Sequence, residues 1–416
     1  NLNRAINKIT MGDGSVKFVE QNLLNTDLTL NLSQNIPWTG GSLFLETSAQ
    51  RMDLFSEHKY SWQTSPIMIG YRQSLFGYNS LKWDKRIEPV RYQEAKKNYV
   101  ETLELVSANA INKFFALATA QSNYDIASFN YANADTLYRY AQGRYNIGTI
   151  TENEMLQLEL NRLTEETNRM NARIEMDNCM QELRSYLGIQ EEREIRVRVS
   201  SRIPNFSINL NEALALAYEN SPDIQTMKRR KLESESAVAR ARANAGLKAD
   251  IYLRFGLTQT ADKLPEAYRN LLDQQYVSLS ISLPILDWGR GKGQVRVARS
   301  NRDLVYTQVE QSRTDFELNV RKLVKQFNLQ TQRVRIAART DETAQRRNEV
   351  ARKLYILGKS TILDLNASIS EKDSARRNYV SALYNYWSLY YTLRSMTLYD
   401  FESNKLLTED YNLLIE

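Results

Sequence analysis

The side chains that could carry out catalysis are few in this chain. There is one cysteine, Cys179, and one histidine, His58. Zinc and redox motifs need several Cys or His ligands, and a catalytic nucleophile needs a positioned base. The run GRGKG at 289–293 lacks the spacing of a phosphate loop, so we interpret it as a bend. We therefore expect no enzyme, no cofactor and no metal, with Cys179 packed in a helix and His58 exposed in a polar loop.

The charge balance does not point to a nucleic-acid partner. The net charge is 55 − 49 = +6 and the pI is about 9.1. Acidic and basic residues are interspersed, as in Arg162, Glu165, Glu166 and Arg169, which indicates solvated helix faces. No apolar run reaches the roughly 18 residues of a spanning helix. This excludes a helical membrane protein but not a transmembrane barrel, whose strands alternate. No signal peptide is visible at the start, as expected of a mature or truncated chain.

Long helices must provide most of the framework. The chain has 15 Gly and 7 Pro, a total of 22, against roughly 50 at an average usage of about 12 per cent. Residues 90–142, 149–187, 294–357 and 359–416 contain neither. Short glycine turns at 143–148 and at Gly358 separate these runs, which predicts two antiparallel helical hairpins.

The two halves of the chain come into register at a constant shift of 210 residues. The matched turn positions are Tyr145, Gly148, Thr151 and Glu154 with Tyr355, Gly358, Thr361 and Asp364. Asn168 also matches Asn378, and LRS at 183–185 matches LRS at 393–395. We interpret the chain as a tandem duplication of strands, long helix, turn and long helix.

Before each long helix the pattern changes to strict alternation. Residues 27–33, 67–71, 251–255 and 277–283 alternate apolar with other residues, which predicts strands, with polar loops at 10–24, 52–65 and 260–274. A half-buried sheet in a soluble domain would show the same alternation. In a membrane, four to six strands are too few to close a barrel of about eight, so several chains would have to pool their strands.

These motifs resemble the TolC-like outer-membrane channel family, also called outer membrane efflux proteins. The shared features are LPILDWG at 283–289, the weaker QSLFG at 73–77, and the turns YNIGTIT at 145–151 and YILGKST at 355–361. The resemblance implies a homotrimer that pools its strands into one barrel in the outer membrane of a diderm bacterium. It also implies a helical tunnel across the periplasm, docked to a periplasmic adaptor and an inner-membrane pump, and export of drugs, toxic compounds or secreted polypeptides.

The resemblance divides the chain into two repeats. We expect a first repeat at 1–206 and a second at 207–416, made of strands 1–76, hairpin 79–188, equatorial segment 189–206, helix 207–247, strands 249–284, hairpin 288–398 and equatorial segment 399–416. A helix upstream of the first strands, expected by analogy with 210–247, is not seen in the sequence. An extra strand pair around 37–41 leaves either four or six strands per chain.

The family's functional positions can be carried over residue by residue. The adaptor-docking tips would be Tyr145, Ile147, Gly148, Thr149, Tyr355, Leu357, Gly358, Lys359 and Ser360. Glu154 and Asp364 would form a ring of six carboxylates at the aperture of a trimer, although Ala367 stands where the family has a further acid. Trp38, Tyr71, Tyr78 and Trp288 would mark the membrane interface.

Each of these positions also has a purely structural interpretation. Gly148 and Gly358 could simply close helix turns, Glu154 and Asp364 could be ordinary exposed acids, and the aromatic residues at strand ends could be packed. We expect the tyrosine-rich stretch 384–391 to pack in the helical wall. At the level of the whole protein, a periplasmic coiled-coil adaptor or scaffold is the alternative, but it leaves the alternating strands unexplained.

Overall fold

The computed structural model describes residues 2–10, 15–55, 58–190, 194–200, 203–357 and 359–407. The chain forms two compact units. The first consists of Asn1–Tyr92 and Thr226–Glu310, and the second of Gln93–Gln225 and Gln311–Glu416. Each unit therefore draws on both predicted repeats rather than coinciding with one of them.

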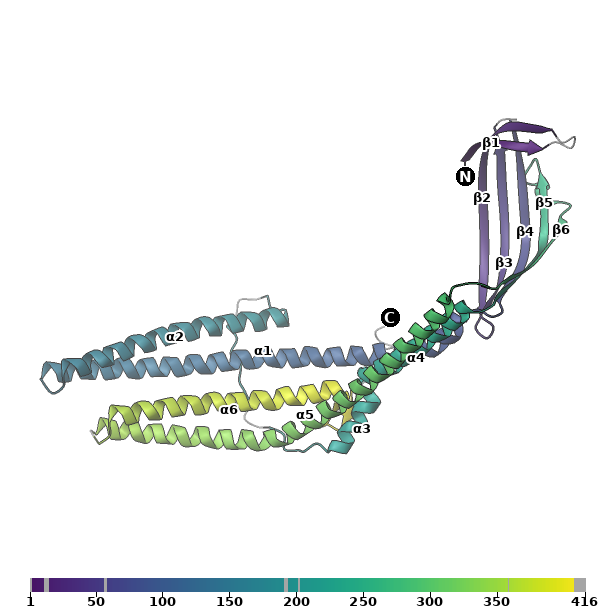
Figure 1. Ribbon diagram of the computed structural model, residues 1–416. Helices are drawn as coiled ribbons and strands as arrows, with labels where there is room; N and C mark the ends of the chain where they lie inside the picture. The colour runs from purple at the N-terminus through teal and green to yellow at the C-terminus, as the bar shows by residue number, and fades with distance from the viewer. Residues whose placement is uncertain are drawn as a thin grey trace. The chain divides into compact units, whose positions relative to one another are not determined.

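The first unit contains an antiparallel sheet of six strands in sequence order (Figure 1). The strands are β1 (Leu2–Thr10), β2 (Val16–Ile36), β3 (Gly41–Leu54), β4 (Lys59–Ser74), β5 (Lys248–Ala261) and β6 (Leu272–Ser282). A 3-10 turn, η1 (Glu266–Tyr268), lies between the last two. The prediction of loops at 10–24, 52–65 and 260–274 was wrong for 16–24, 52–54, 59–65, 260–261 and 272–274. These polar stretches form ladder pairs that satisfy their backbone groups.

The six strands do not run side by side over one length. β3 pairs with β2 from Leu23 to Ile36, whereas β1 pairs only with residues 16–24 of β2. β1 thus lies beyond the end of β3, as the upper hairpin in Figure 1 shows. The sheet includes the extra strand pair inferred from the sequence. Five strands, β2 to β6, lie side by side along the length of β3, and β1 does not.

Two long helical hairpins follow the strands. The first is α1 (Ser80–Asn146) with α2 (Glu152–Leu187), and the second is α5 (Arg290–Ile356) with α6 (Ile362–Thr397). The first helix of each hairpin has 67 residues and the second has 36. Both pairs of starting positions differ by 210 residues, the shift found in the sequence. Both predicted hairpins are therefore observed.

Shorter elements connect these hairpins. α3 (Leu210–Asn220) and α4 (Pro222–Ala245) replace the single helix predicted at 207–247. That prediction was wrong because Ser221 is extended, with ψ 135°, and Pro222 opens a new helix. Proline disfavours a helical residue before it and suits the first turn of a helix. Near the C-terminus, β7 (Tyr399–Asp400) pairs with β8 (Lys405–Leu406).

The core of the second unit lies between its helices. Leu117, Met176 and Leu183 are buried together, and Cys179 packs against them, so burial raises the pKa of this thiol. Tyr386 and Tyr390 are fully buried beside Phe327. The predicted packing roles of Cys179 and the tyrosine stretch are confirmed, and His58 is exposed as expected. Among the described helices, none is both long and apolar enough to cross a membrane.

Candidate functional site

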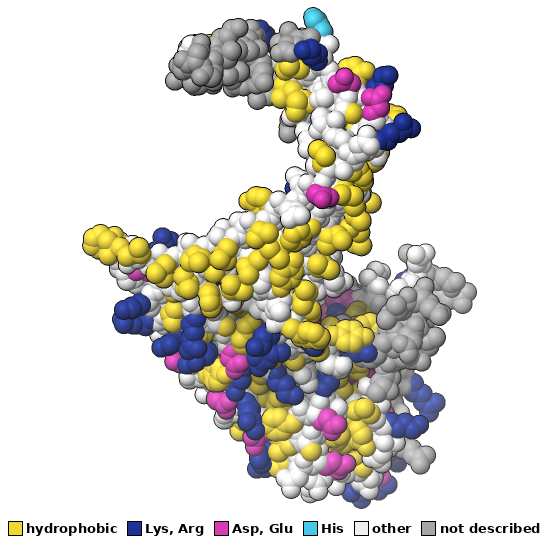
Figure 2. All heavy atoms as spheres, turned by 90° about the vertical axis from the view of Figure 1, so that its right-hand side faces the viewer, with side chains coloured by type: hydrophobic (Ala, Val, Ile, Leu, Met, Phe, Trp, Pro, Cys, Tyr) yellow, Lys and Arg dark blue, Asp and Glu magenta, His cyan; other side chains and the backbone are white. Residues whose placement is uncertain are grey.

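One face of the sheet is apolar and exposed. Leu32, Leu45, Ile69 and Phe255 are direct neighbours on four adjacent strands and are 42–71% exposed. Yellow side chains cover this part of the sheet in Figure 2. A row of this kind exceeds the scattered apolar residues of an ordinary soluble surface and indicates a lipid or protein partner.

The opposite face of the sheet carries an ion pair beside the buried side chains of Phe44 and Met68. Glu46 on β3 forms an ion pair with Arg254 on β5 at 3.2 Å, across β4. The strand between them carries Gly70, where an added Cβ would lie 2.0 Å from the Phe44 ring. Glycine therefore allows the neighbouring side chains to meet over β4. The two faces of the sheet therefore differ: one exposes a row of apolar side chains, and the other holds a charged pair.

The junction between β6 and α5 is held by one carboxylate. Asp287 accepts hydrogen bonds from the backbone N–H groups of Gly289, at 2.9 Å, and Gly291, at 2.8 Å. The bond from Gly291 is the main reason that the pKa of Asp287 is lowered. Trp288 and Gly289 both have positive φ, 54° and 80°, so the chain turns sharply before α5. The LPILDWG motif is thus a helix-start structure, in agreement with the predicted bend.

The junction between β4 and α1 uses an amide instead. Asn79 caps α1 by accepting a hydrogen bond from the N–H of Lys82 at 3.0 Å, and its amide donates to the carbonyl of Pro37 at 3.0 Å. The β2–β3 turn is thereby fixed beside the start of the helix. Trp38 in that turn is 87% exposed, and Trp288 at the other junction is 89% exposed.

The other two predicted interface aromatics are bound to protein groups. Tyr71 donates to Oε1 of Gln73 at 2.8 Å, and the hydroxyls of Tyr78 and Ser236 lie 2.5 Å apart. The ring of Tyr78 also lies 4.7 Å from the Arg240 guanidinium. Of the four aromatic positions, the two tryptophans are therefore the ones that project freely from the described first unit.

The tip of the first hairpin ends in a left-handed glycine. Gly148 has φ 72° and donates to the carbonyl of Tyr145 at 2.8 Å, while Thr149 donates to the carbonyl of Arg144 at 2.9 Å. These two bonds form a Schellman motif, which satisfies the last carbonyls of α1. Ile147, beside the glycine, is 73% exposed. The turn-closing role of Gly148 is confirmed.

The second tip repeats this geometry in the residues that the structure describes. Lys359 donates to the carbonyl of Leu354 at 2.9 Å, the counterpart of the Thr149 bond. Leu357 and Lys359 are exposed, whereas Tyr355 and Ser360 are half-buried. Gly358, predicted as the glycine of this tip, lies outside the described residues.

The two predicted aperture acids occupy the same local position. Thr151 caps α2 and Thr361 caps α6, and each forms a capping box with the acid three residues later, Glu154 or Asp364. The side-chain hydrogen bond from Thr361 is the main cause that lowers the pKa of Asp364. Both acids are exposed. Each acid therefore stabilises the first turn of its helix, and this role does not depend on an aperture ring.

Two adjoining grooves lie beside the tips, within the second unit. Their volumes are about 570 and 690 Å³. Tyr140 and Arg144 from the first hairpin and Tyr355 and Ile369 from the second line both grooves. The tips therefore offer a concave surface with aromatic, apolar and cationic side chains, which suits a protein partner.

A buried polar contact joins the two hairpins. Asn130 on α1 donates to Asp373 on α6 at 2.7 Å, and Asp373 is 5% exposed. Lys372 Nζ lies 3.2 Å from the other carboxylate oxygen. This pair could not be predicted from a local sequence pattern, because its members are 243 residues apart. The only signal was a polar residue inside a long helical run.

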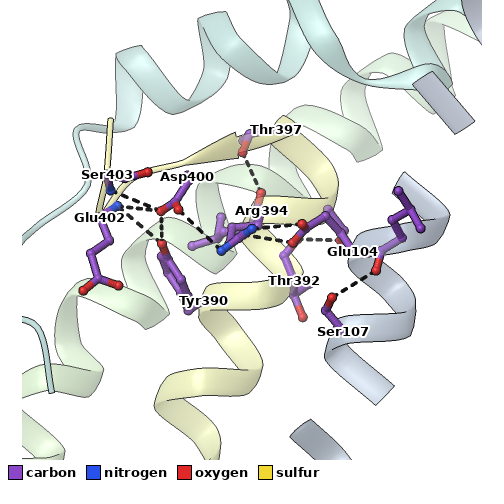
Figure 3. A network of polar contacts seen from close by, with 12 residues as sticks. Glu104, Ser107, Tyr390, Thr392, Arg394, Thr397, Asp400, Glu402 and Ser403 are labelled. Atoms are coloured by element: carbon purple, nitrogen blue, oxygen red, sulfur yellow. Dashed lines mark hydrogen bonds and ion pairs between the residues drawn. The ribbon is translucent and has the colours of Figure 1, made fainter. Parts of the chain in front are cut away.

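A second buried network ties the C-terminal segment to α1 (Figure 3). The Arg394 guanidinium donates one hydrogen bond to Oε1 of Glu104 at 2.9 Å, and its Nε lies 2.9 Å from the other carboxylate oxygen in an ion pair. The guanidinium also lies 3.5 Å from Asp400. Asp400 also accepts a hydrogen bond from the hydroxyl of Tyr390, whose pKa is raised mainly by burial. The network joins α1, α6 and β7, and it too was absent from the sequence interpretation.

Comparison with known proteins gives one family match. The model for outer membrane efflux proteins matches residues 213–397. None of the curated proteins is similar enough in sequence to match.

Several solved structures, all with low sequence identity, have a similar fold. The Campylobacter jejuni CmeC outer membrane channel is 15% identical, with a TM-score of 0.67 over 95% of this chain and 80% of that one. The Vibrio cholerae outer membrane protein VceC is 14% identical, with a TM-score of 0.62 over 90% and 86%. The open state of the Neisseria gonorrhoeae MtrE channel is 14% identical, with a TM-score of 0.55 over 93% and 81%.

Proposed function

We propose that the chain is the outer-membrane channel of a tripartite efflux or type I secretion system. Residues 213–397 match the model for outer membrane efflux proteins, and the fold is similar to that of an outer membrane channel. The family is one of channels rather than of enzymes. In this role the chain is a passive export duct for drugs, small toxic compounds or secreted polypeptides.

The observation that carries this proposal is the exposed apolar row on the sheet, formed by Leu32, Leu45, Ile69 and Phe255. In a periplasmic adaptor or scaffold this row would face water at a cost of about 25 cal/mol per Å² of apolar surface. In lipid it is favourable, and the opposite face, with Glu46 and Arg254, lines the hydrated interior. The sheet therefore supports a membrane channel over the coiled-coil alternative.

A homotrimer would pair the two open edges of the sheet with neighbouring chains. β1 and β6 are the outer strands of the sheet, and an unpaired edge cannot face hydrocarbon. Pooling strands from three chains would close a barrel, and the hairpins of three chains would pack into a tunnel across the periplasm. A duplicated hairpin with equal helix lengths suits such a closed ring.

We propose that the tips and their grooves dock a periplasmic adaptor, which links the channel to an inner-membrane pump. Exposed Ile147 and Leu357 provide apolar contacts, and Glu154 and Asp364 would ring the aperture of the trimer. Opening would separate the hairpins, so the buried Asn130 contact with Asp373 would have to change during gating.

A matched pair of glycine variants tests the docking role. Gly148 and Gly188 both have left-handed φ, 72° and 68°, and a Cβ added at either would meet nothing within 4 Å. Gly148 lies at the tip, whereas Gly188 closes the far end of α2. The backbone strain of Gly148→Trp and Gly188→Trp is thus similar, and only the first change places bulk on the docking surface.

We expect Gly148→Trp to abolish export and adaptor cross-linking while trimers still reach the outer membrane and conduct ions in planar bilayers. Gly188→Trp should export normally. Equal loss in both variants would show a folding defect and refute the docking assignment. A wild-type chain that fractionates as a soluble monomer would refute the channel itself.

A further inference from the structure

We propose that the helical residues next to the sheet form a binding surface for anionic phospholipid headgroups. This surface, the basic collar, comes from residues 80–86, 239–248 and 287–296. Its cations are Lys82, Lys85, Arg86, Arg240, Arg242, Lys248, Arg290, Lys292 and Arg296. The inference rests on the proposed function, since the collar faces headgroups only if the sheet lies in the membrane.

The positive charge of the chain is concentrated in the collar. Its three segments contain nine cations and two acids, Asp84 and Asp287, and Glu235 on α4 pairs with Arg86, so the net charge including that partner is 9 − 3 = +6. The whole chain also carries +6, which leaves 6 − 6 = 0 for all other residues. Acidic and basic residues are interspersed along the sequence, but the fold brings the excess of basic residues together at one end of the sheet.

The three segments lie together although they are far apart in the sequence. The Tyr78 hydroxyl contacts Ser236 on α4, and the Arg240 guanidinium lies over the Tyr78 ring. An added Cβ at Gly291 on α5 would lie 3.0 Å from the Cβ of Ala245 on α4. A groove of about 520 Å³ is lined by residues of α1, α4 and α5. The collar is therefore one continuous part of the first unit.

The cations of the collar are available to a ligand. All nine are exposed. Arg86 lies 3.9 Å from Glu235, and the other eight form no ion pair with any residue that the structure describes. Asp287 stays ionised, because backbone hydrogen bonds from Gly291 and Gly289 lower the pKa of its carboxyl group, and it offsets one of the nine positive charges.

The position of the collar matches that of a headgroup layer. Lys248 begins β5 opposite the last residue of β6, Ser282. Arg290 and Arg296 are six residues apart on α5, which places them about 9 Å apart along the helix axis. The α5 part of the collar therefore extends over about one Debye length at physiological salt, roughly 8 Å.

Two exposed tryptophans mark the same end of the sheet. Trp38 is fixed beside the start of α1 through Asn79, and Trp288 lies two residues before α5. Tryptophan favours the membrane–water interface. Above these residues lies the apolar face of the sheet, and dark-blue side chains border the yellow ones in Figure 2. The surface thus changes from apolar residues to tryptophans and then to cations. A bilayer changes in the same order, from hydrocarbon chains to the interface and then to anionic headgroups.

Tryptophan quenching by brominated lipids tests the proposal on the reconstituted trimer. Brominated phosphatidylglycerol is compared with brominated phosphatidylcholine at equal mole fraction. A cation close to an anionic membrane surface gains about 1 kcal/mol, or about fivefold in affinity. We therefore expect about a fivefold preference for phosphatidylglycerol at low salt, and its loss in about 1 M salt.

The collar variant is Lys82→Gln, Lys292→Gln and Arg296→Gln combined. The matched control is Lys322→Gln, Lys325→Gln and Arg333→Gln, three exposed cations on α5 in the second unit. We expect the preference for phosphatidylglycerol to fall toward one in the collar variant and to persist in the control. Equal quenching by both lipids in the wild type, or an unchanged preference in the collar variant, would refute the collar while leaving the channel intact. No quenching by either lipid would refute membrane insertion, and with it both proposals.

Discussion

The Arg394 network allows a quantitative test of what holds the second unit together. We consider Arg394→Met, which keeps an unbranched side chain of similar reach but removes the guanidinium. In the native chain this group forms a hydrogen bond and an ion pair with Glu104, both at 2.9 Å, and lies 3.5 Å from Asp400. The variant would leave two carboxylates close together without their shared cation.

The expected cost follows from burial. The side chains of Arg394 and Glu104 are only 16% and 10% exposed, so water cannot replace the lost partner. Breaking a buried pair from one side costs about 3–5 kcal/mol of unfolding free energy. Removing both charges together, in Arg394→Met with Glu104→Leu, should cost much less than the sum of the single changes, because no uncompensated carboxylate remains at position 104.

An exposed pair in the same unit provides the control. Arg321 and Glu317 lie four residues apart on α5 at 2.7 Å, with side chains 47% and 38% exposed. Arg321→Met should cost about 0.5 kcal/mol or less. The comparison therefore holds the substitution constant and varies only the burial of the ion pair.

Chemical unfolding followed by tryptophan fluorescence would measure these costs. Trp387 packs against Tyr386 and Tyr390 at ring distances of 5.4 and 6.0 Å, so its emission reports on the region around Arg394. The reasoning is refuted if Arg394→Met shifts the unfolding midpoint no more than Arg321→Met does. It is also refuted if the double variant is as unstable as the two single variants added together.

Two further predictions concern charge and pH. Asp364→Asn should lower the cation preference of single channels if Asp364 contributes to an aperture ring. The control, Glu371→Gln, changes an exposed residue further along α6 and should leave the cation preference unaltered. Equal effects of the two variants would argue against the ring. Burial raises the pKa of Tyr386 from 10.0 to about 12, so its contribution to stability is complete below pH 10 and is lost between about pH 10 and 12. Unfolding midpoints measured across this window should fall more steeply in the wild type than in Tyr386→Phe, and parallel curves would contradict the assignment.

The helical part of the fold could be predicted because its signals are local. The scarcity of Gly and Pro defined the hairpins, and Gly148 marked a tip because only a residue without a Cβ adopts φ 72° at no cost. The break at Ser221 and Pro222 was also readable but was overlooked. The strand limits were not readable, because polar residues in 16–24 and 59–65 satisfy their backbone through partners distant in sequence.

The contacts that matter most for the candidate sites could not be predicted in this way. Asn130 contacts Asp373, and Glu104 contacts Arg394, only when the two hairpins have packed together. The basic collar is a similar case, because no single segment of it is unusually basic for a helix surface. Composition reported the excess charge correctly, yet its location depends on how α1, α4 and α5 meet.

The capping boxes show why a local and a channel role can coincide at one residue. A carboxylate three residues after Thr151 or Thr361 is favoured at a helix start by the free N–H groups and the helix dipole. The same geometry holds Glu154 and Asp364 beside the tips, where a trimer would place six such charges around one opening. Asparagine at 364 can still accept a hydrogen bond from the helix start, whereas alanine cannot. Comparing Asp364→Asn with Asp364→Ala therefore separates loss of the ring charge from loss of the cap, because only the second should also destabilise the first turn of α6.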